Sequence, residues 1–318
     1  MKTPVLYIVI PCYNEEEALP ITSEKLIQLT DDMISRNLID AKSKITLVDD
    51  GSRDKTWEVI SGLCNRDKRF EGVKLAHNAG HMNALWAGMT MVKDKCDCVI
   101  TIDADLQDDV KAMYGFLEKY QQGADVVSGV RSSRKTDTFF KRTTAQGFYK
   151  LMQHMGVEMV YNHADYRLLS KRALEALLSF GEVNMFLRGM VPMLGFNTAI
   201  VEYERGERVA GESKYPLKKM IAFAMEGITS LSNKPIRMVT AAGLFCALLG
   251  IVMAVYVLIS LCRGHSVAGW ASIMMSIWLL GGLQLTALGL IGEYVGKIYM
   301  ETKHRPKFIL EEYIHGEK

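Results

Sequence analysis

Short apolar runs alternate with amphipathic stretches over roughly the first 130 residues of the chain. The apolar runs predict strands at Val5–Ile10, Lys44–Val48, Val73–Ala76, Cys98–Ile102 and Asp125–Ser128. The stretches between them space their apolar residues three and four positions apart, which predicts helices near Glu16–Arg36, Lys55–Cys64, Asn83–Lys93 and Val110–Gln122. This alternation favours an α/β fold with a mainly parallel sheet and helices on both faces.

The pattern changes near residue 236, where two long apolar runs begin. Met238–Cys262 holds 25 residues without a charge, and Ser266–Gly292 holds 27. At about 1.5 Å per residue, each run forms a helix of roughly 37–40 Å, enough to cross a hydrocarbon core of about 30 Å. Only Arg263–His265 joins them. We therefore expect a transmembrane hairpin with spans at 236–262 and 266–292.

Basic residues flank both outer ends of this hairpin, whereas the link holds one arginine and one histidine. The positive-inside rule then places the domain at 1–214, the tail at 293–318 and both termini in the cytoplasm, on the inner face of the cell membrane. Residues 215–235 carry an apolar stripe at helical spacing, which predicts an amphipathic helix in the membrane interface. Packing of that helix against the preceding domain is the alternative.

Composition narrows the function mainly by exclusion. The net charge of +2 gives no support for a nucleic-acid partner. The six cysteines show no CxxC pair and no histidine spacing typical of zinc, so we expect reduced, mostly buried thiols. No GxGxxG follows the first strand and no GxxxxGK[ST] loop is present, so the oxidoreductase and ATPase classes lose their main support.

Asp103 and Asp105 carry the clearest chemical signal, because they follow a predicted strand directly. Ligands in open α/β sheets bind at the carboxyl ends of the strands. Two carboxylates one residue apart can meet on one hard cation such as Mg²⁺ or Mn²⁺, which also binds diphosphate oxygens. Such a cation would stabilise a departing nucleoside diphosphate. Acidic loops after strands are common, so the pair alone is weak support.

Further motifs occur in a fixed order around this pair. They are Pro11–Glu15, Val48–Asp54, Asp103–Gln107, Ser128–Arg131, Asp165–Leu169, Phe186–Gly189 and Arg208–Tyr215. The first four resemble the family 2 glycosyltransferases, which have the Rossmann-like GT-A fold. With the later three and the terminal hairpin, the chain resembles the polyisoprenyl-phosphate glycosyltransferases, a group that includes bactoprenol glucosyltransferases and dolichyl-phosphate mannose synthases. The resemblance covers essentially the whole chain.

The resemblance implies a donor site. In this site the base and ribose of the donor nucleotide would contact Pro11, Tyr13, Glu15 and Asp50. A plain turn explains these residue types equally well in isolation. Asp103 would lie near the nucleotide and the metal, and Asp105 and Gln107 would be metal ligands. Asn78, Gly80 and His81 match a loop that runs beside the donor in related enzymes, and a solvated loop is the alternative for His81.

The acceptor side follows from the chemistry of a lipid phosphate. A phosphomonoester carries a charge of about −1.5 to −2 near neutral pH, so its oxygen is already a nucleophile and needs cations to hold it. Arginine binds phosphate with two nitrogens, which makes Arg131 the first candidate and Arg142 the second. By resemblance Asp165 is a base or a sugar ligand, and we prefer a positioning role. Arg208, Ser213 and Lys214 could close over the diphosphate.

The chain is therefore expected to transfer a hexose, with UDP-glucose favoured, to a polyprenyl phosphate, with inversion implied by the resemblance. It would act at the bilayer as a homo-oligomer, up to a tetramer. A processive synthase should show a QxxRW motif and more spans, neither of which is present. A non-catalytic adaptor should have lost Asp103 and Asp105. A nucleotide-sugar hydrolase stays open, although it has no evident need of a hairpin.

Overall fold

The computed structural model describes residues 3–105, 107–132, 155, 163–183, 185–204, 228–230, 232, 234–263 and 269–315. Its strands are β1 Leu6–Cys12, β2 Lys44–Asp49, β3 Phe70–Leu75, β4 Cys98–Thr101, β5 Val126–Arg131, β6 His163–Ser170, β7 Thr198–Tyr203 and β8 Leu310–Ile314. Its helices are α1 Ala18–Ser35, α2 Thr56–Arg66, α3 His81–Val92, α4 Ala112–Gln121, α6 Lys171–Leu178, α7 Leu187–Met193, α9 Lys234–Cys262 and α10 Trp270–Thr302.

The described strands form one sheet in the order β7-β5-β6-β4-β1-β2-β3-β8. Strands β4, β1, β2 and β3 pair in parallel, as the alternating pattern predicts. The sheet as a whole is mixed rather than mainly parallel, because β6 runs antiparallel between β4 and β5 and β8 runs antiparallel to β3. The predicted strands all form, although β3 begins earlier, at Phe70, and β5 continues to Arg131.

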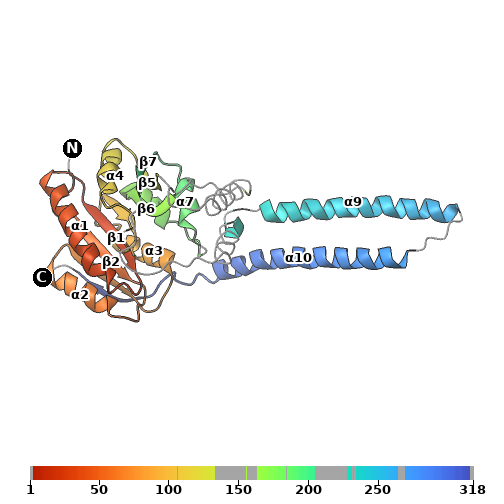
Figure 1. The fold of residues 1–318 in the computed structure, drawn as a ribbon, viewed down its shortest axis with the longest axis horizontal. Helices are drawn as coiled ribbons and strands as arrows, with labels where there is room; N and C mark the ends of the chain where they lie inside the picture. Colours follow the sequence, from red (N-terminus) through yellow and green to blue (C-terminus); the bar gives the residue numbers. More distant parts are fainter. Residues whose placement is uncertain are drawn as a thin grey trace.

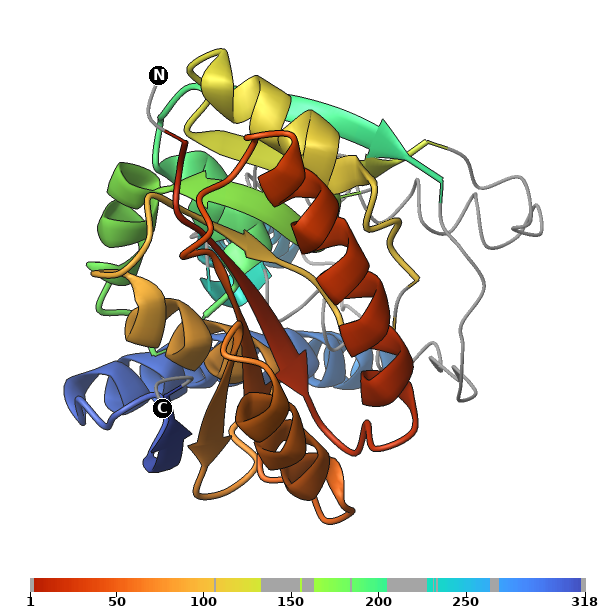
Figure 2. The same ribbon diagram turned by 90° about the vertical axis from the view of Figure 1, so that its left-hand side faces the viewer.

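Both faces of the sheet are covered by helices, as expected (Figure 2). Successive side chains of a strand point to opposite faces. Leu6, Ile8 and Ile10 of β1 therefore pack with α1, α2 and α4, whereas Tyr7 and Val9 pack with α3, α6 and α7. Every residue of β1 is buried, which is typical of a central strand covered on both sides.

Helices α9 and α10 run side by side in opposite directions and extend away from the sheet (Figure 1). They occupy the two long apolar runs, and α10 continues past Gly292 to Thr302. Within the part of the chain that the structure describes, no helix combines the length and apolar character needed to cross a membrane. The spans predicted at 236–262 and 266–292 are thus not confirmed. Most of the predicted 215–235 helix lies outside the described residues.

The segment after α10 returns to the sheet, whereas the sequence predicted only a tail at 293–318. Strand β8 extends the sheet beyond β3, far from it in sequence. Glu311 forms an ion pair of 2.9 Å with Lys74, and Glu312 accepts a hydrogen bond of 3.2 Å from Trp57 Nε1. The ammonium of Lys307 lies 3.5 Å from the centre of the Trp86 ring. The C-terminal end of α10 is thereby tied to the sheet.

Tyr313→Phe is expected to lower the free energy of unfolding by about 1–3 kcal/mol, because it removes a donor from a buried carboxylate. Tyr313 Oη donates to Glu71, which is only 2% exposed, over 2.6 Å. Lys44, at 3.1 Å, and Lys95, at 3.7 Å, also pair with this carboxylate. Chemical denaturation of the purified protein in detergent measures the change.

Tyr120→Phe is the matched control for this variant. Its hydroxyl donates to the uncharged backbone oxygen of Asp97 over 3.3 Å, so the loss should be no more than about 1.5 kcal/mol. A Tyr313→Phe protein that is as stable as the wild type would show that β8 contributes little through Glu71.

Candidate active site

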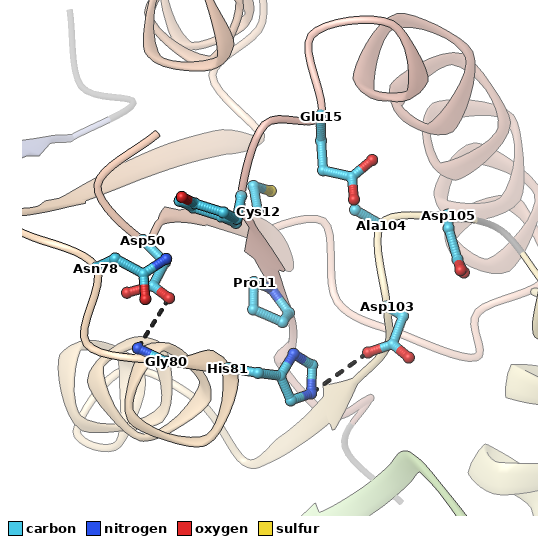
Figure 3. Close-up of a pocket in the computed structure, with 11 residues that line it drawn as sticks. Pro11, Cys12, Glu15, Asp50, Asn78, Gly80, His81, Asp103, Ala104 and Asp105 are labelled. Carbon is cyan, nitrogen blue, oxygen red and sulfur yellow. Dashed lines mark hydrogen bonds and ion pairs between the residues drawn. The ribbon is translucent and has the colours of Figure 1, made fainter. Parts of the chain in front are cut away.

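A pocket of about 250 Å³ opens at the carboxyl ends of β1, β2 and β4 (Figure 3). Parallel strands place these ends at the same edge of the sheet, which is where open α/β sheets bind ligands. The pocket is lined by Pro11, Cys12, Tyr13, Glu15, Asp50, Asn78, Gly80, His81, Asp103, Ala104 and Asp105. Polar clusters that are far apart in sequence thus meet in one place.

The loops after β1 and β2 are fastened to each other by side chains. Asn14 has a φ of 55°, a left-handed conformation that asparagine tolerates better than most residues. Its Oδ1 accepts a hydrogen bond of 2.9 Å from the Arg53 N–H, and Glu15 N–H donates to Thr56 Oγ1 over 2.8 Å. These bonds hold the segment that directly follows Tyr13, a residue that stays 43% exposed.

Asp50 holds the turn that precedes α3. Its carboxylate accepts a hydrogen bond of 2.7 Å from the Ala79 N–H. It accepts a second, of 3.0 Å, from the Gly80 N–H (Figure 3). Burial raises the pKa of Asp50, although these two bonds favour its charged form. The predicted contact of Asp50 with the base of a donor stays a prediction, since the carboxylate already has this structural role.

Gly51→Ala is expected to lower the free energy of unfolding by about 1–3 kcal/mol through backbone strain. Gly51 has a φ of +66°, and an added Cβ would lie 2.6 Å from Asn78 N. Because Asn78 lines the pocket, we also expect a higher KM for the donor. Gly62→Ala, inside α2 with nothing within 4 Å of its Cβ position, is the control and should not destabilise the protein. Equal stability of both variants would contradict the strain argument.

Asp103 and His81 face each other across the pocket (Figure 3). His81 Nε2 lies 3.6 Å from Asp103 Oδ1 and 3.9 Å from Asp165 Oδ2. Burial raises the pKa of Asp103 to about 6; His81 opposes this rise, and the nearby carboxylates Asp165, Asp108 and Asp105 add to it. Asp105 is partly exposed, and its Oδ1 accepts a hydrogen bond of 3.2 Å from Gln107 N–H. The pocket therefore concentrates negative charge.

The two carboxylates fit a divalent cation that arrives with a substrate. Asp103 and Asp105 offer the hard oxygen donors that Mg²⁺ and Mn²⁺ prefer. Oδ1 of Asp103 is buried and has no hydrogen-bond partner within the described residues. In the same part of the chain, no three His, Cys, Asp or Glu side chains are grouped to hold a metal ion by themselves. Mg²⁺ commonly binds one or two carboxylates together with substrate phosphates.

Asp165 is buried in a cluster with two arginines. It shares one face of β6 with Arg167, because side chains two residues apart on a strand point the same way. Asp165 Oδ1 accepts a bond of 2.7 Å from Arg167 Nη2, and Oδ2 accepts one of 2.8 Å from Arg188 Nη2 on α7. Burial alone would raise the pKa of Asp165, but the charges of Arg188 and Arg167 outweigh burial and hold it well below its usual range. So weak a base suits positioning rather than proton transfer.

The structure brings together nine of the predicted site residues, which are Pro11, Tyr13, Glu15, Asp50, Asn78, Gly80, His81, Asp103 and Asp105. Gln107 is buried beside the pocket and does not line it. Arg131 also lies outside the pocket lining, and its guanidinium contacts Asp108, a residue for which no role was predicted. The predicted acceptor residues Arg142, Arg208, Ser213 and Lys214 lie outside the described residues.

Two family models match this chain. Residues 7–178 match the model of glycosyl transferase family 2, and residues 234–298 match that of the GtrB C-terminal hairpin. The first match runs from the second residue of β1 through β6 and contains the whole pocket, and the second contains α9 and most of α10.

Several curated proteins are similar over nearly the whole chain. The uncharacterized glycosyltransferase YkoT of Bacillus subtilis (strain 168) is 53% identical over 315 residues, covering 99% of this chain and 94% of its own. A bactoprenol glucosyl transferase of Shigella phage SfV is 39% identical, covering 96% and 97%. The structure of glucosyl-3-phosphoglycerate synthase from Mycobacterium tuberculosis superposes with a TM-score of 0.46 and 17% identity, covering 72% of this chain and 78% of its own. This similarity is too distant to support a functional argument.

Proposed function

The chain belongs to glycosyl transferase family 2, and from this premise we propose that it transfers a hexose from a nucleotide sugar to the phosphate of a polyprenyl phosphate lipid. The bactoprenol glucosyl transferase of phage SfV, similar over 96% of this chain, supports a lipid acceptor and glucose as the sugar. The match of 234–298 to a C-terminal hairpin model supports the same group of enzymes. UDP-glucose is the donor that we favour.

The observation that carries this proposal is the pocket at the ends of β1, β2 and β4. Asp103 and Asp105 lie on one side of it, and the loop that Asp50 holds lies on the other (Figure 3). A nucleotide sugar needs contacts for a base and ribose and a counter-charge for its diphosphate. Tyr13, which is 43% exposed, suits the nucleoside, and the two carboxylates suit a cation bound to the diphosphate.

The reaction would be a single displacement. An oxygen of the lipid phosphate forms a bond to the anomeric carbon as the bond from that carbon to the diphosphate oxygen breaks, which inverts the carbon and releases a nucleoside diphosphate. The phosphate is already an anion near neutral pH, so no residue has to remove a proton from it. Asp103 and Asp105 would hold Mg²⁺ or Mn²⁺, whose charge stabilises the departing diphosphate.

We place the hairpin in the membrane as part of this proposal. The described residues of α9 and α10 expose large apolar side chains along their length, such as Leu244, Leu248, Ile273 and Ile277. Exposed apolar surface of this extent calls for an apolar partner or medium. Basic residues at both outer ends favour a cytoplasmic catalytic domain. A homo-oligomer, up to a tetramer, also stays a prediction. Measurement of the mass of the protein in detergent tests it.

The test is transfer of radiolabelled sugar into material that extracts with organic solvent. The full-length protein receives polyprenyl phosphate and Mg²⁺ or Mn²⁺, with UDP-glucose, UDP-N-acetylglucosamine and GDP-mannose in parallel. We expect label in the lipid from UDP-glucose, and loss of that label when a chelator is added. Release of free sugar and nucleoside diphosphate without a lipid product would favour a hydrolase. Inactivity with all three donors would leave either a rarer donor or the non-catalytic adaptor.

A further inference from the structure

A buried carboxylate outside the pocket lining contacts the predicted phosphate-binding arginine. The Asp108 side chain is 1% exposed. Its Oδ1 accepts hydrogen bonds from Arg131 Nη2, at 3.1 Å, from Arg131 Nε, at 3.3 Å, and from Tyr203 Oη, at 2.6 Å. Oδ2 is also buried, and no described residue forms a hydrogen bond with it. Leaving a buried carboxylate oxygen without a partner costs free energy, so the presence of an aspartate at position 108 needs an explanation.

The topology places two of these three residues at the ends of neighbouring strands. Arg131 and Tyr203 are the last residues of β5 and β7, and they are register partners in this parallel pair. Asp108 lies on the loop that carries Asp103 and Asp105. Asp108 therefore joins the acidic loop of the pocket to the strand end that carries Arg131.

Aromatic packing makes this junction rigid. The ring of Tyr203 packs edge-on against Tyr166, with centroids 5.4 Å apart. Tyr166 Oη donates to the backbone oxygen of Asp109 over 3.1 Å, next to Asp108. Gly129 allows Tyr203 to approach β5, since an added Cβ would lie 2.9 Å from its ring. Burial and the Asp108 carboxylate raise the pKa of Tyr203, so its hydroxyl stays a donor.

We propose that Asp108 and Tyr203 are positioning residues, which hold the Arg131 guanidinium in one orientation for the phosphate of the acceptor. The inference rests on the proposed function. Asp108 binds Nε and Nη2 of Arg131. The Arg131 side chain is still 27% exposed, so part of its guanidinium is available to bind an anion. A flexible arginine loses conformational entropy when it binds phosphate, and an arginine that is already ordered loses less.

The rival explanation is that Asp108 only supports the loop that carries Asp103 and Asp105. The two roles predict different kinetics. Support of the loop would change the metal requirement and the KM for the nucleotide sugar. Positioning of Arg131 changes the KM for the lipid phosphate and leaves the other two constants near their wild-type values.

The experiment measures three constants in the full-length protein, which are the KM values for undecaprenyl phosphate and UDP-glucose and the Mn²⁺ concentration for half activation. The variants are Asp108→Asn, Tyr203→Phe, Arg131→Ala and the double variant Asp108→Asn with Arg131→Ala. Two variants are the controls. Asp109→Asn changes an exposed neighbour on the same loop, and Tyr120→Phe changes a residue whose hydroxyl bonds the backbone oxygen of Asp97.

We expect Asp108→Asn and Tyr203→Phe to raise the KM for the lipid phosphate by about tenfold, which corresponds to about 1.4 kcal/mol. The KM for UDP-glucose, the Mn²⁺ requirement and both controls should stay near wild type. The double variant should be no worse than Arg131→Ala, because Asp108 acts through Arg131. Tyr203→Phe keeps the ring packing, so it tests the proposal even if Asp108→Asn fails to fold.

Additive effects in the double variant would overturn the inference, and so would equal rises in all three constants. An unchanged KM for the lipid phosphate in Tyr203→Phe, with active wild-type enzyme, would overturn this inference alone. A wild-type protein that makes no lipid-linked sugar with any donor would overturn the proposed function and, with it, the acceptor role of Arg131.

Discussion

Asp105→Asn is expected to reduce sugar transfer by at least about 100-fold, the size of effect seen when one electrostatic contact to a transition state is lost. Asparagine keeps the size of the side chain and can still accept the hydrogen bond from Gln107 N–H. The substitution therefore removes the charge and keeps the turn. Since Asp103 alone would then have to hold the cation, a much higher Mg²⁺ or Mn²⁺ concentration should be needed for any remaining activity.

Transfer rates over a range of metal concentrations measure this effect, with a thermal melting curve to show that the variant is folded. Asp109→Asn is the matched control, because this carboxylate lies on the same loop and is exposed outside the pocket lining. It should retain nearly full activity. Full activity in Asp105→Asn together with indifference to a chelator would falsify the assignment of a metal to this pair.

The part of the fold that builds the pocket could be predicted because its signals are local. Central parallel strands are buried on both faces, so β1, β2 and β4 appear as continuous apolar runs in the sequence. Polar residues follow each run directly, and parallel pairing brings the strand ends to one edge. The convergence of Glu15, Asp50 and Asp103 is therefore predictable from the order of runs and clusters alone. Their individual roles stay predictions.

The strands that the sequence missed depend on long-range pairing. Strand β8 reads Leu-Glu-Glu-Tyr-Ile, too short and too acidic to stand out, and its partner β3 lies more than 200 residues earlier. Strand β6 carries Asp165 and Arg167 in its interior, which weakens its apolar pattern. Both charges are tolerated because they pair with each other after folding. No local pattern in the sequence indicates that two buried charges will pair in this way.

The contacts of Arg131 and Arg188 could not be predicted from the sequence either. Asp108 follows the Asp103–Gln107 motif and looks like one more acid in an acidic loop. Its contact with Arg131 arises because β4, β5 and β7 end near each other in the folded sheet. In the same way, Arg188 was noted as part of a motif, and only the packing of α7 brings it to Asp165. The motifs contained Arg131 and Arg188, but nothing in their spacing could pair either arginine with its carboxylate.

Asp165→Ala is expected to lower the free energy of unfolding by about 3–5 kcal/mol, because it leaves a buried charge without its partner. Arg167 is 2% exposed, and its Nη1 donates a hydrogen bond of 3.3 Å to the backbone oxygen of Leu187. A carbonyl oxygen cannot neutralise a guanidinium. Chemical denaturation in detergent measures the loss, and Asp125→Ala is the control. Asp125 pairs with Arg172, whose side chain is 66% exposed and can be solvated by water, so a smaller loss is expected there.

The pH dependence gives a second measure of the same interaction. The pKa of Asp165 in the folded protein lies well below its unfolded value of about 3.9. Its stabilisation is therefore fully present above that value and is lost as the pH falls toward the folded pKa, a dependence that Asp165→Ala should lack. Replacing both charges, as in Asp165→Leu with Arg167→Met, should recover part of the stability, because no deeply buried charge is then left unpaired. A double variant less stable than Asp165→Ala would show that Arg167 stabilises the fold through contacts other than this carboxylate.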